Sequence, residues 1–434
     1  MSLRELIRGG EYHSYAYSYP HKTAYRTLSS PVSLRELWST EDRTALFLYL
    51  HVPFCEQRCG FCNLFTQVQP QKEIESRYLT ALELQAQVMR EVLFPHRFVR
   101  LAIGGGTPTF LSASHLDRLF GVARTLSADQ IPTSIEVSPS TLDDEKTAVL
   151  ISHRVSRVSM GVQSIFPSET AGVLRRQRQP DVERALILLS SSVAIRNVDL
   201  IYGLPGQTTE TLRASIDRVV ELGANELYLY PLYVRPLTIL SRHRAHSDER
   251  TNLYRAARDY LLRRGFRQAS MRMFTAAGHP GDGSSGPTYR CQDDGMVGLG
   301  PGARSYTRSL HYATPFAVAQ AAIRERIEQW MLSSAEDHAQ ARHGFFLGEA
   351  ERRRRYLILT LLDGRLDRHA YLCRFGGDVC AHFPELTETV DTGLVIADAD
   401  SLQLTPMGIE CADVLGHFLQ SESVLSARAS WEAA

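Results

Sequence analysis

The chain has 434 residues, which is long enough for two or three domains. It carries 48 basic and 48 acidic side chains, so its formal net charge is zero and no general field would attract nucleic acid or an anionic membrane. Its start has no apolar segment typical of a secretory signal, and no stretch of about 18 apolar residues could span a membrane. These features, and the four scattered cysteines outside one cluster, predict a cytoplasmic protein.

Apolar strand-like segments alternate with segments of helical periodicity over the first half of the chain. The six expected strands cover residues 45–52, 98–103, 133–138, 157–162, 196–204 and 226–234. The expected helices between them cover residues 72–93, a stretch from about 114, and residues 142–151, 181–191 and 208–222. This alternation predicts an α/β fold with a parallel sheet and helical crossovers.

The pattern changes after about residue 235. A helix over 249–266 and one strand over 268–274 precede a Gly-, Pro- and Ser-rich loop at 275–287. From about residue 344 the sequence predicts a separate small domain, with helices at 349–364 and near Tyr371, a hairpin at 393–405 and a final helix from Pro406. The run Arg352–Arg355 reads as a solvated or interdomain helix face, and residues 420–434 as a frayed tail.

Three of the seven cysteines form a C-x3-C-x2-C run, Cys55, Cys59 and Cys62, on a loop that follows the first strand after Pro53. Iron–sulfur clusters are normally held by four thiolates, so three local ones suggest a cluster with one iron open to a ligand. A disulfide would leave an odd cysteine, and a zinc site would need a fourth ligand that is not evident nearby. The carboxyl edge of a parallel sheet is also where active sites of α/β proteins lie.

This spacing resembles the signature of the radical S-adenosylmethionine superfamily. The string Tyr49, His51, Pro53, Phe54 and Cys55 resembles the Y-x-H-x-P-F-C of one branch, oxygen-independent coproporphyrinogen III oxidase and its relatives. Further segments are similar to that branch in the same order: YAYSYP at 15–20, AIGGGTPTFL at 102–111, SIEVSPST at 134–141, RVSMGVQS at 157–164 and NVDLIYGLPGQT at 197–208.

The resemblance implies a partial (β/α)6 TIM-like radical S-adenosylmethionine barrel, an α+β extension and a small winged-helix-like C-terminal domain. The expected division is an N-terminal extension at 1–44, the barrel core at 45–240, the extension that completes the active site at 241–340, and the C-terminal domain at 341–434.

The resemblance also implies the cofactors. Cys55, Cys59 and Cys62 would bind a [4Fe–4S] cluster, and the open iron would bind S-adenosylmethionine, whose reductive cleavage gives a 5′-deoxyadenosyl radical. The expected S-adenosylmethionine contacts are Tyr49, Phe61, Gly105, Gly106, Thr107, Glu136, Gln163, Arg176 and Asp199, with Gly104 beside them. Arg175 is the alternative to Arg176, because the chain differs from the family by one residue nearby. Plain packing, a turn, solvation and a structural ion pair are the non-functional alternatives for these positions.

His51 reads as a packed, hydrogen-bonded residue rather than a catalytic one, and no catalytic residue is assigned. Leu64 stands where a true coproporphyrinogen oxidase has a further cysteine, and the segment TYRCQDDGMVGLGPGARS lacks the His and Trp of haem-chaperone relatives. The sequence therefore predicts an enzyme that begins by abstracting hydrogen from a small-molecule or tetrapyrrole-like substrate, with an electron donor such as flavodoxin or ferredoxin. The alternatives are a methyltransferase or cyclopropanase with a second S-adenosylmethionine near Gly298–Ser305, where a plain turn is the other reading, and a tetrapyrrole-binding chaperone without turnover.

Overall fold

The computed structural model describes residues 2–9, 12, 18–235, 238–242, 249–281 and 291–431. The chain forms two compact units, and each is described by itself. The large unit takes in residues 26–267 and 274–344, and the small unit draws on residues 1–25, 268–273 and 345–431. The four-part division expected from the sequence is finer than this and stays a prediction. Among the described helices, none is both long and apolar enough to cross a membrane.

Six parallel strands form the centre of the large unit, in the order in which they occur along the chain. The predicted α/β fold with a parallel sheet is confirmed, whereas its closure into a partial barrel stays a prediction. The strands are β2 (Leu46–Val52), β5 (Phe98–Gly105), β6 (Thr133–Val137), β7 (Arg157–Gln163), β8 (Ile195–Tyr202) and β9 (Glu226–Pro231).

Side chains alternate along the strands, so that the sheet has an apolar outer face and a polar inner face. On β7, Val158, Met160 and Val162 are fully buried, while Arg157 and Ser159 alternate with them on the other face. Burying such apolar side chains stabilises the sheet by about 1.5–3 kcal/mol each. The inner face is therefore free to carry polar groups.

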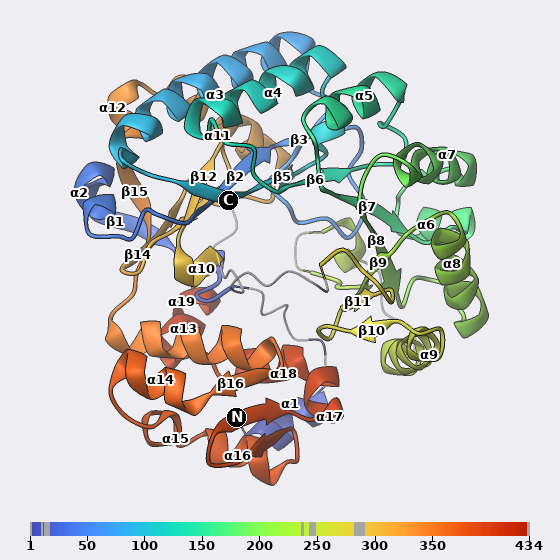
Figure 1. Cartoon of the computed structure of the whole chain (residues 1–434), viewed down its shortest axis with the longest axis vertical. Helices are drawn as coiled ribbons and strands as arrows, with labels where there is room; N and C mark the ends of the chain where they lie inside the picture. The colour runs from blue at the N-terminus through green and yellow to red at the C-terminus, as the bar shows by residue number, and fades with distance from the viewer. Residues whose placement is uncertain are drawn as a thin grey trace. The chain divides into compact units, whose positions relative to one another are not determined.

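Helices cover the outer side of the curved sheet (Figure 1). They are α3 (Lys72–Leu93), α4 (Ala113–Leu126), α5 (Asp144–Ser152), α6 (Pro167–Gly172), α7 (Gln179–Ser190) and α8 (Thr209–Glu221). Side-chain caps fix where three of them begin: Ser112 for α4, Asp143 for α5 and Thr208 for α8. Such a cap satisfies a backbone N–H that has no partner within the helix.

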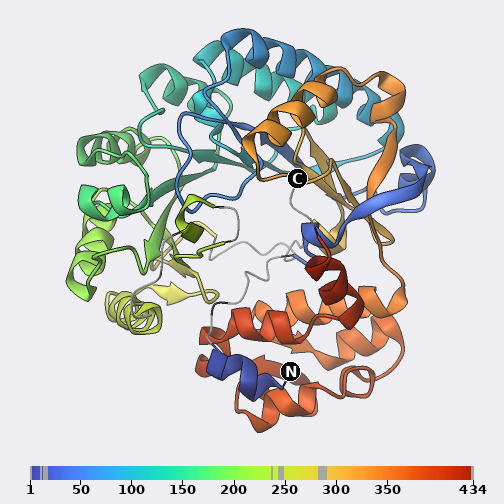
Figure 2. The same ribbon diagram turned by 180° about the vertical axis from the view of Figure 1, so that it is seen from behind.

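The sheet continues beyond β2 into strands from distant parts of the sequence. Strand β12 (Met296–Leu299) pairs in parallel with β2, and β13 (Arg304–Tyr306), β14 (Leu310–Ala313), β15 (Gln340–Phe346) and β1 (Arg26–Ser33) follow in that order. Figure 2 shows these yellow and orange strands beside the blue ones. The other elements of the large unit are α2 (Leu34–Ser39), α9 (Arg250–Arg263), α10 (Cys291–Asp294), α11 (Gln320–Met331) and α12 (Ala335–His338).

The single strand expected over 268–274 is wrong. The chain forms two short strands there, β10 (Arg267–Gln268) and β11 (Met273–Thr275), with a turn between them. The hydroxyl of Ser270 accepts from the backbone N–H groups of Arg272 and Met273, which closes the turn. A serine that bonds its neighbours' backbone competes with the ladder of a continuous strand. The loop expected at 275–287 lies partly outside the described residues.

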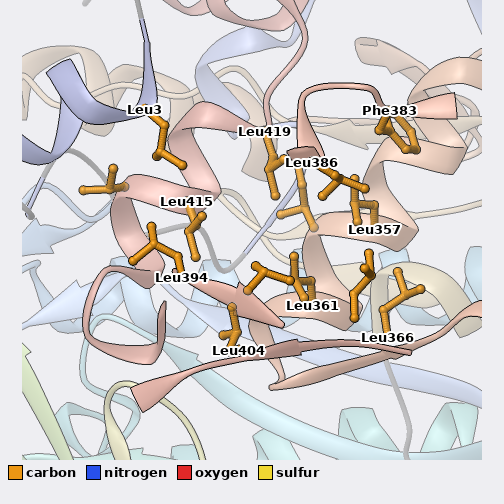
Figure 3. Packing of buried hydrophobic residues seen from close by; sticks show 14 of the residues in the cluster. Leu3, Leu357, Leu361, Leu366, Phe383, Leu386, Leu394, Leu404, Leu415 and Leu419 are labelled. Atoms are coloured by element: carbon orange, nitrogen blue, oxygen red, sulfur yellow. The ribbon is translucent and has the colours of Figure 1, made fainter. Parts of the chain in front are cut away.

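The small unit packs helices around a three-stranded sheet and one apolar cluster, of which Figure 3 shows Leu357, Leu361 and Leu415 among others. Its strands are β16 (Arg365–Asp367), β17 (Val395–Ala397) and β18 (Ser401–Leu404). Its helices are α1 (Leu3–Gly9), α13 (Glu349–Leu362), α14 (Arg368–Phe375), α15 (Val379–His382), α16 (Leu386–Asp391), α17 (Pro406–Glu410), α18 (Ala412–Phe418) and α19 (Glu422–Ala429). Its winged-helix-like character stays a prediction.

The frayed tail expected from residue 420 is wrong for its described part. Residues Glu422–Ala429 form α19, which Ser421 caps by accepting from the N–H of Val424. Val424 is fully buried in the apolar cluster, and the Tyr19 hydroxyl bonds Ser421. The tail is ordered because one apolar side chain and one cap anchor it, a signal too sparse to be read as periodicity.

We expect the substitution Leu415→Ala to lower the free energy of unfolding by about 2–5 kcal/mol, because it leaves a cavity in the cluster. Leu415 is 0% exposed. The matched control is Leu372→Ala on α14, whose side chain is 48% exposed and which should change stability by less than about 1 kcal/mol. Urea unfolding followed by circular dichroism measures both. Equal losses in the two variants would contradict the assigned core.

Candidate cofactor site

The three cysteines lie on a loop between β2 and α3 that backbone hydrogen bonds fold tightly. Short strands β3 (Phe54–Cys55) and β4 (Gln67–Val68) pair at its two ends. The N–H of Cys62 donates to the carbonyl of Cys59 at 3.0 Å, and none of the three cysteines is in a disulfide bond. The N–H of Gly60 donates to the Val173 carbonyl at 2.8 Å, which ties the loop to the segment after α6.

The glycine segment at the end of β5 lies directly against this loop. Gly106 donates its N–H to Val52 and Thr107 donates to Phe54, both at 2.7 Å. A side chain on Gly106 would lie 2.4 Å from the Phe54 carbonyl oxygen and 3.0 Å from the Cys55 sulfur. Gly105 has φ +114°, and a side chain there would lie 2.7 Å from the His51 ring. Only glycine fits at both positions.

In the absence of metal, the surroundings of Cys55 favour the neutral thiol over the thiolate. Burial, with the neighbouring Cys62 and Cys59, raises the pKa of Cys55 to about 12, although the Thr107 hydroxyl donates to its sulfur at 3.6 Å. Three thiolates this close need cations between them, because a metal replaces the protons that the thiols would otherwise keep. Among the described residues no three His, Cys, Asp or Glu side chains converge on a single ion. Three cysteines on one loop are the number of thiolates expected for a cluster with one open iron, and their role as its ligands stays a prediction.

Two carboxylates face the interior from neighbouring parts of the sheet. Glu136 on β6 accepts from the N–H of Gly105 at 3.1 Å, which places it beside the glycine segment. Desolvation of the carboxylate by its surroundings and the charge of Asp199 raise the pKa of Glu136 to about 7, while the residue as a whole is exposed. Burial raises the pKa of Asp199 on β8 to about 6. Two carboxylates held partly protonated near neutral pH fit a site awaiting hydrogen-bond donors or a cation.

Neighbouring polar groups hold Asp199 in place. The Asn197 amide donates to Oδ1 at 2.7 Å, and the Ser159 hydroxyl donates to Oδ2 at 3.4 Å. On the strand between the two carboxylates, Gln163 ends β7 in a left-handed conformation with φ +69°. That conformation is unusual for a residue other than glycine and costs about 1–3 kcal/mol, as strained residues at functional sites do.

The structure separates the two arginines between which the sequence left a choice. Arg175 points at the cysteine loop: Nη1 lies 3.4 Å from the Cys59 sulfur, and Nη2 donates to the Gly161 carbonyl. Arg176 is exposed, and its backbone rather than its side chain meets the loop, through two hydrogen bonds with the Gln57 amide. The geometry favours Arg175 over Arg176 as the side chain at the site.

Tyr49 and His51 lie on β2, just before the cysteine loop, and Phe61 lies on the loop itself. The hydroxyl of Tyr49 bonds His51 Nδ1 at 3.1 Å, and His51 Nε2 lies 3.2 Å from the Phe65 carbonyl oxygen. His51 is buried, so it is a packed and hydrogen-bonded residue, as expected from the sequence. Phe61 packs against an apolar cluster that includes Val173.

The glycine-rich turn between β12 and β13 packs onto the same histidine. A side chain on Gly300 would lie 2.6 Å from the His51 carbonyl oxygen, and one on Gly302 would lie 2.9 Å from its ring. The N–H groups of these glycines donate to Gln85 and Thr314 at 2.8 and 2.7 Å. This segment acts as a packed turn, and its backbone donors are already used within the protein.

Sequence reasoning missed a charged group on the inner face. Arg157 and Glu226, the first residues of β7 and β9, form an ion pair there, and His279 lies 3.2 Å from the same carboxylate. Arg157 stands inside a segment that the sequence analysis quoted, RVSMGVQS. The available signal was its alternation with buried Val158 and Met160, which puts it on the inner face with Ser159.

Comparison with known proteins gives consistent results. The profile of the radical SAM superfamily matches residues 49–219. The chain is 27% identical over 426 residues to the oxygen-independent coproporphyrinogen III oxidase of Paracoccus denitrificans, covering 90% of this chain and 91% of that one. It is 30% identical over 275 residues to the heme chaperone HemW of Bacillus subtilis, covering 59% of this chain and 70% of that one.

The fold has a solved counterpart. The structure of coproporphyrinogen III oxidase (HemN) from Escherichia coli is similar with a TM-score of 0.76 at 24% identity, over 89% of this chain and 92% of that one. The likeness extends over both units and supports the mixed α/β fold.

The raised pKa of Glu136 gives a pH prediction for the cluster-free protein. Its pKa rises from an ordinary 4.5 to about 7 on folding, so the folded state binds more protons in that window and loses stability as pH rises through it. We expect wild type to lose stability relative to Glu136→Gln between pH 5 and pH 8 in urea unfolding. The exposed Glu91→Gln is the control and should show no such trend. A constant difference between wild type and Glu136→Gln at both pH values would contradict the shift.

Proposed function

The chain belongs to the radical S-adenosylmethionine superfamily, in the branch of the oxygen-independent coproporphyrinogen III oxidases, and from that premise we propose that Cys55, Cys59 and Cys62 hold its [4Fe–4S] cluster. The observation that carries this proposal is that three cysteines outside any disulfide share one loop with a glycine segment packed against it, which leaves no room for a side chain beside Cys55. The cofactors of this oxidoreductase are the cluster and S-adenosylmethionine.

Bound together, the two cofactors supply a 5′-deoxyadenosyl radical by reductive cleavage of S-adenosylmethionine. The protein binds, orients and shields them. Gly105, Gly106 and Thr107 let the backbone approach the methionyl amine closely, since no Cβ intervenes at the two glycines. The accessible part of Glu136 and the carboxylate of Asp199 would accept hydrogen bonds from the ribose hydroxyls.

The remaining contacts are assigned by position. Gln163 lies at the carboxyl end of β7, between the strands that carry Glu136 and Asp199, and would approach the same ribose. Tyr49 and Phe61 flank the cysteine loop and would pack beside the cofactor. Arg175 takes the role expected of Arg176, because its guanidinium already faces the loop and suits a planar carboxylate.

For the substrate, we propose a small molecule related to the tetrapyrroles, on the strength of the relatives' names, with hydrogen abstraction as the first step. Leu64, which replaces the family's further cysteine, is 45% exposed and marks a difference from coproporphyrinogen oxidases beside the cluster loop. A flavodoxin or ferredoxin would supply the electron. The cytoplasm, where thiols stay reduced, suits the free cysteines and a cluster with an open iron.

A second candidate is a tetrapyrrole-binding role without turnover, favoured by the similarity to the heme chaperone HemW. A methyl or methylene transfer would need a second S-adenosylmethionine. The turn that includes Gly300 and Gly302 packs against His51 and has its N–H groups satisfied, which speaks against a second cofactor bound by those groups.

The first experiment is anaerobic reconstitution with iron and sulfide, followed by addition of S-adenosylmethionine and dithionite and chromatography of the products. We expect 5′-deoxyadenosine from the wild type and none from the Cys55→Ala, Cys59→Ala, Cys62→Ala variant, which lacks the cluster ligands. Cys373→Ala, at an exposed cysteine of the small unit, is the control and should behave as wild type. S-adenosylhomocysteine as a second product would favour methyl transfer. A loaded cluster with neither product would favour the binding role.

The assignment of Arg175 is tested against its neighbour. We expect Arg175→Gln to weaken S-adenosylmethionine binding by about tenfold or more, since a lost charge-assisted hydrogen bond is worth about 1.5–3 kcal/mol. Arg176→Gln should bind as wild type does, because its side chain is exposed. Equilibrium binding to the reconstituted, unreduced protein measures both. The reverse order of the two effects would restore Arg176 to the site.

A further inference from the structure

Arg157 stands at the start of β7 with its guanidinium held on the inner face of the sheet. Its Nε and Nη2 donate to Glu226 Oε1 at 2.9 and 2.5 Å, and its Nη1 donates to the Ser134 hydroxyl at 3.0 Å. Glu226 is 2% exposed, so the pair is largely removed from water. A buried ion pair is weak evidence for stability, because desolvation offsets the attraction. A role in the cofactor site therefore explains the Arg157–Glu226 pair better than a contribution to stability does.

The strand register leads from this pair to the two proposed cofactor carboxylates. Ser134 pairs with Arg157 across β6 and β7, and Glu136 is the next inner-face residue after Ser134 on β6. On the other side, Ser159 follows Arg157 on the inner face and donates to Asp199. Asn197, which donates to both Ser159 and Asp199, pairs with Glu226 across β8 and β9.

The structure therefore places the cation of Arg157 beside two carboxylates on flanking strands, with a third carboxylate, Glu226, holding that cation in place. We propose that Arg157 is a positioning residue for S-adenosylmethionine binding: its charge favours the ionised forms of Glu136 and Asp199, which accept from the cofactor, and Glu226 sets how much of that charge they receive. This inference rests on the proposed cofactor contacts of Glu136 and Asp199.

The charges of Arg157 and Glu226 shift the carboxylate pKa values in the directions that the proposal requires. The positive charge of Arg157 lowers the pKa of both Glu136 and Asp199, against the burial that raises them, and the negative charge of Glu226 raises the pKa of Asp199. Among the described residues, the other titratable or charged side chains on this face or beside it are Tyr49 and His51 on β2, Arg100 on β5, Arg175 at the Gly161 carbonyl of β7, Tyr228 and Tyr230 on β9, and His279, which lies 3.2 Å from Glu226. Arg157 is the group whose contacts join β6, β7 and β9.

The test measures the dissociation constant of S-adenosylmethionine from pH 5.5 to pH 9, on the reconstituted, unreduced holoenzyme. For wild type we expect affinity to rise with pH as the carboxylates ionise. For Arg157→Gln the midpoint of that rise should move up by about one pH unit, which makes binding about tenfold weaker near pH 7 and close to wild type at pH 9. Arg157→Lys, which keeps the cation, should restore most of the wild-type profile.

Glu226→Gln is the decisive companion variant, because it should move the midpoint in the opposite direction, to lower pH. A merely structural pair would weaken binding in both variants and at every pH. A uniform loss, shifts of the same sign, or an unchanged profile would overturn the inference, and Arg157→Lys with Glu226→Gln keep the test decisive if Arg157→Gln does not fold. Wild type that binds no S-adenosylmethionine at any pH would instead overturn the proposed function.

Discussion

The hydrogen bonds from Gly106 to Val52 and from Thr107 to Phe54 are the contacts on which the site depends. They continue the pairing of β5 with β2 beyond the end of β2, so that the glycine segment and the first cysteine share one backbone frame. Parallel strands end at the same edge, and this edge is where groups from separate strands can meet. The frame requires glycine at 106, because any Cβ would strike the Phe54 carbonyl.

Different positions along the parallel strands carry different kinds of polar group. The groups proposed to contact the cofactors lie nearer the carboxyl ends, whereas the strand starts carry the ion pair of Arg157 and Glu226. The residues between them, Ser159 and Asn197, are small and polar and hydrogen-bond upward to Asp199. These polar residues do not disturb the apolar packing on the outer face, because successive side chains of a strand point to opposite faces of the sheet. The inner face could therefore acquire charge without loss of the apolar core.

The sequence was sufficient for elements whose signals are local. The helix Lys72–Leu93 has the predicted bounds because its periodicity is long and uninterrupted, and the parallel arrangement of the six strands follows from their alternation with helices. Pairings between distant segments, such as β1 with β15, carry no local signal, because their register depends on partners far along the chain. The sequence left Arg175 and Arg176 open for a similar reason: which of the two guanidinium groups faces the cysteine loop depends on the backbone path of residues 173–177, which has no local signal.

The raised pKa values of Glu136 and Asp199 indicate which kind of ligand would suit the site. Partial removal of a carboxylate from water costs free energy unless a cation lies beside it, and one arginine shared with Glu226 only partly offsets that cost for Glu136 and Asp199. A ligand that brings hydroxyl donors and positive charge would complete the balance, and its binding would release the protons that the empty site holds. S-adenosylmethionine has both features, a ribose and a sulfonium. The negative charge on the inner face is thus complementary to the proposed cofactor, and Arg157 offsets part of that charge.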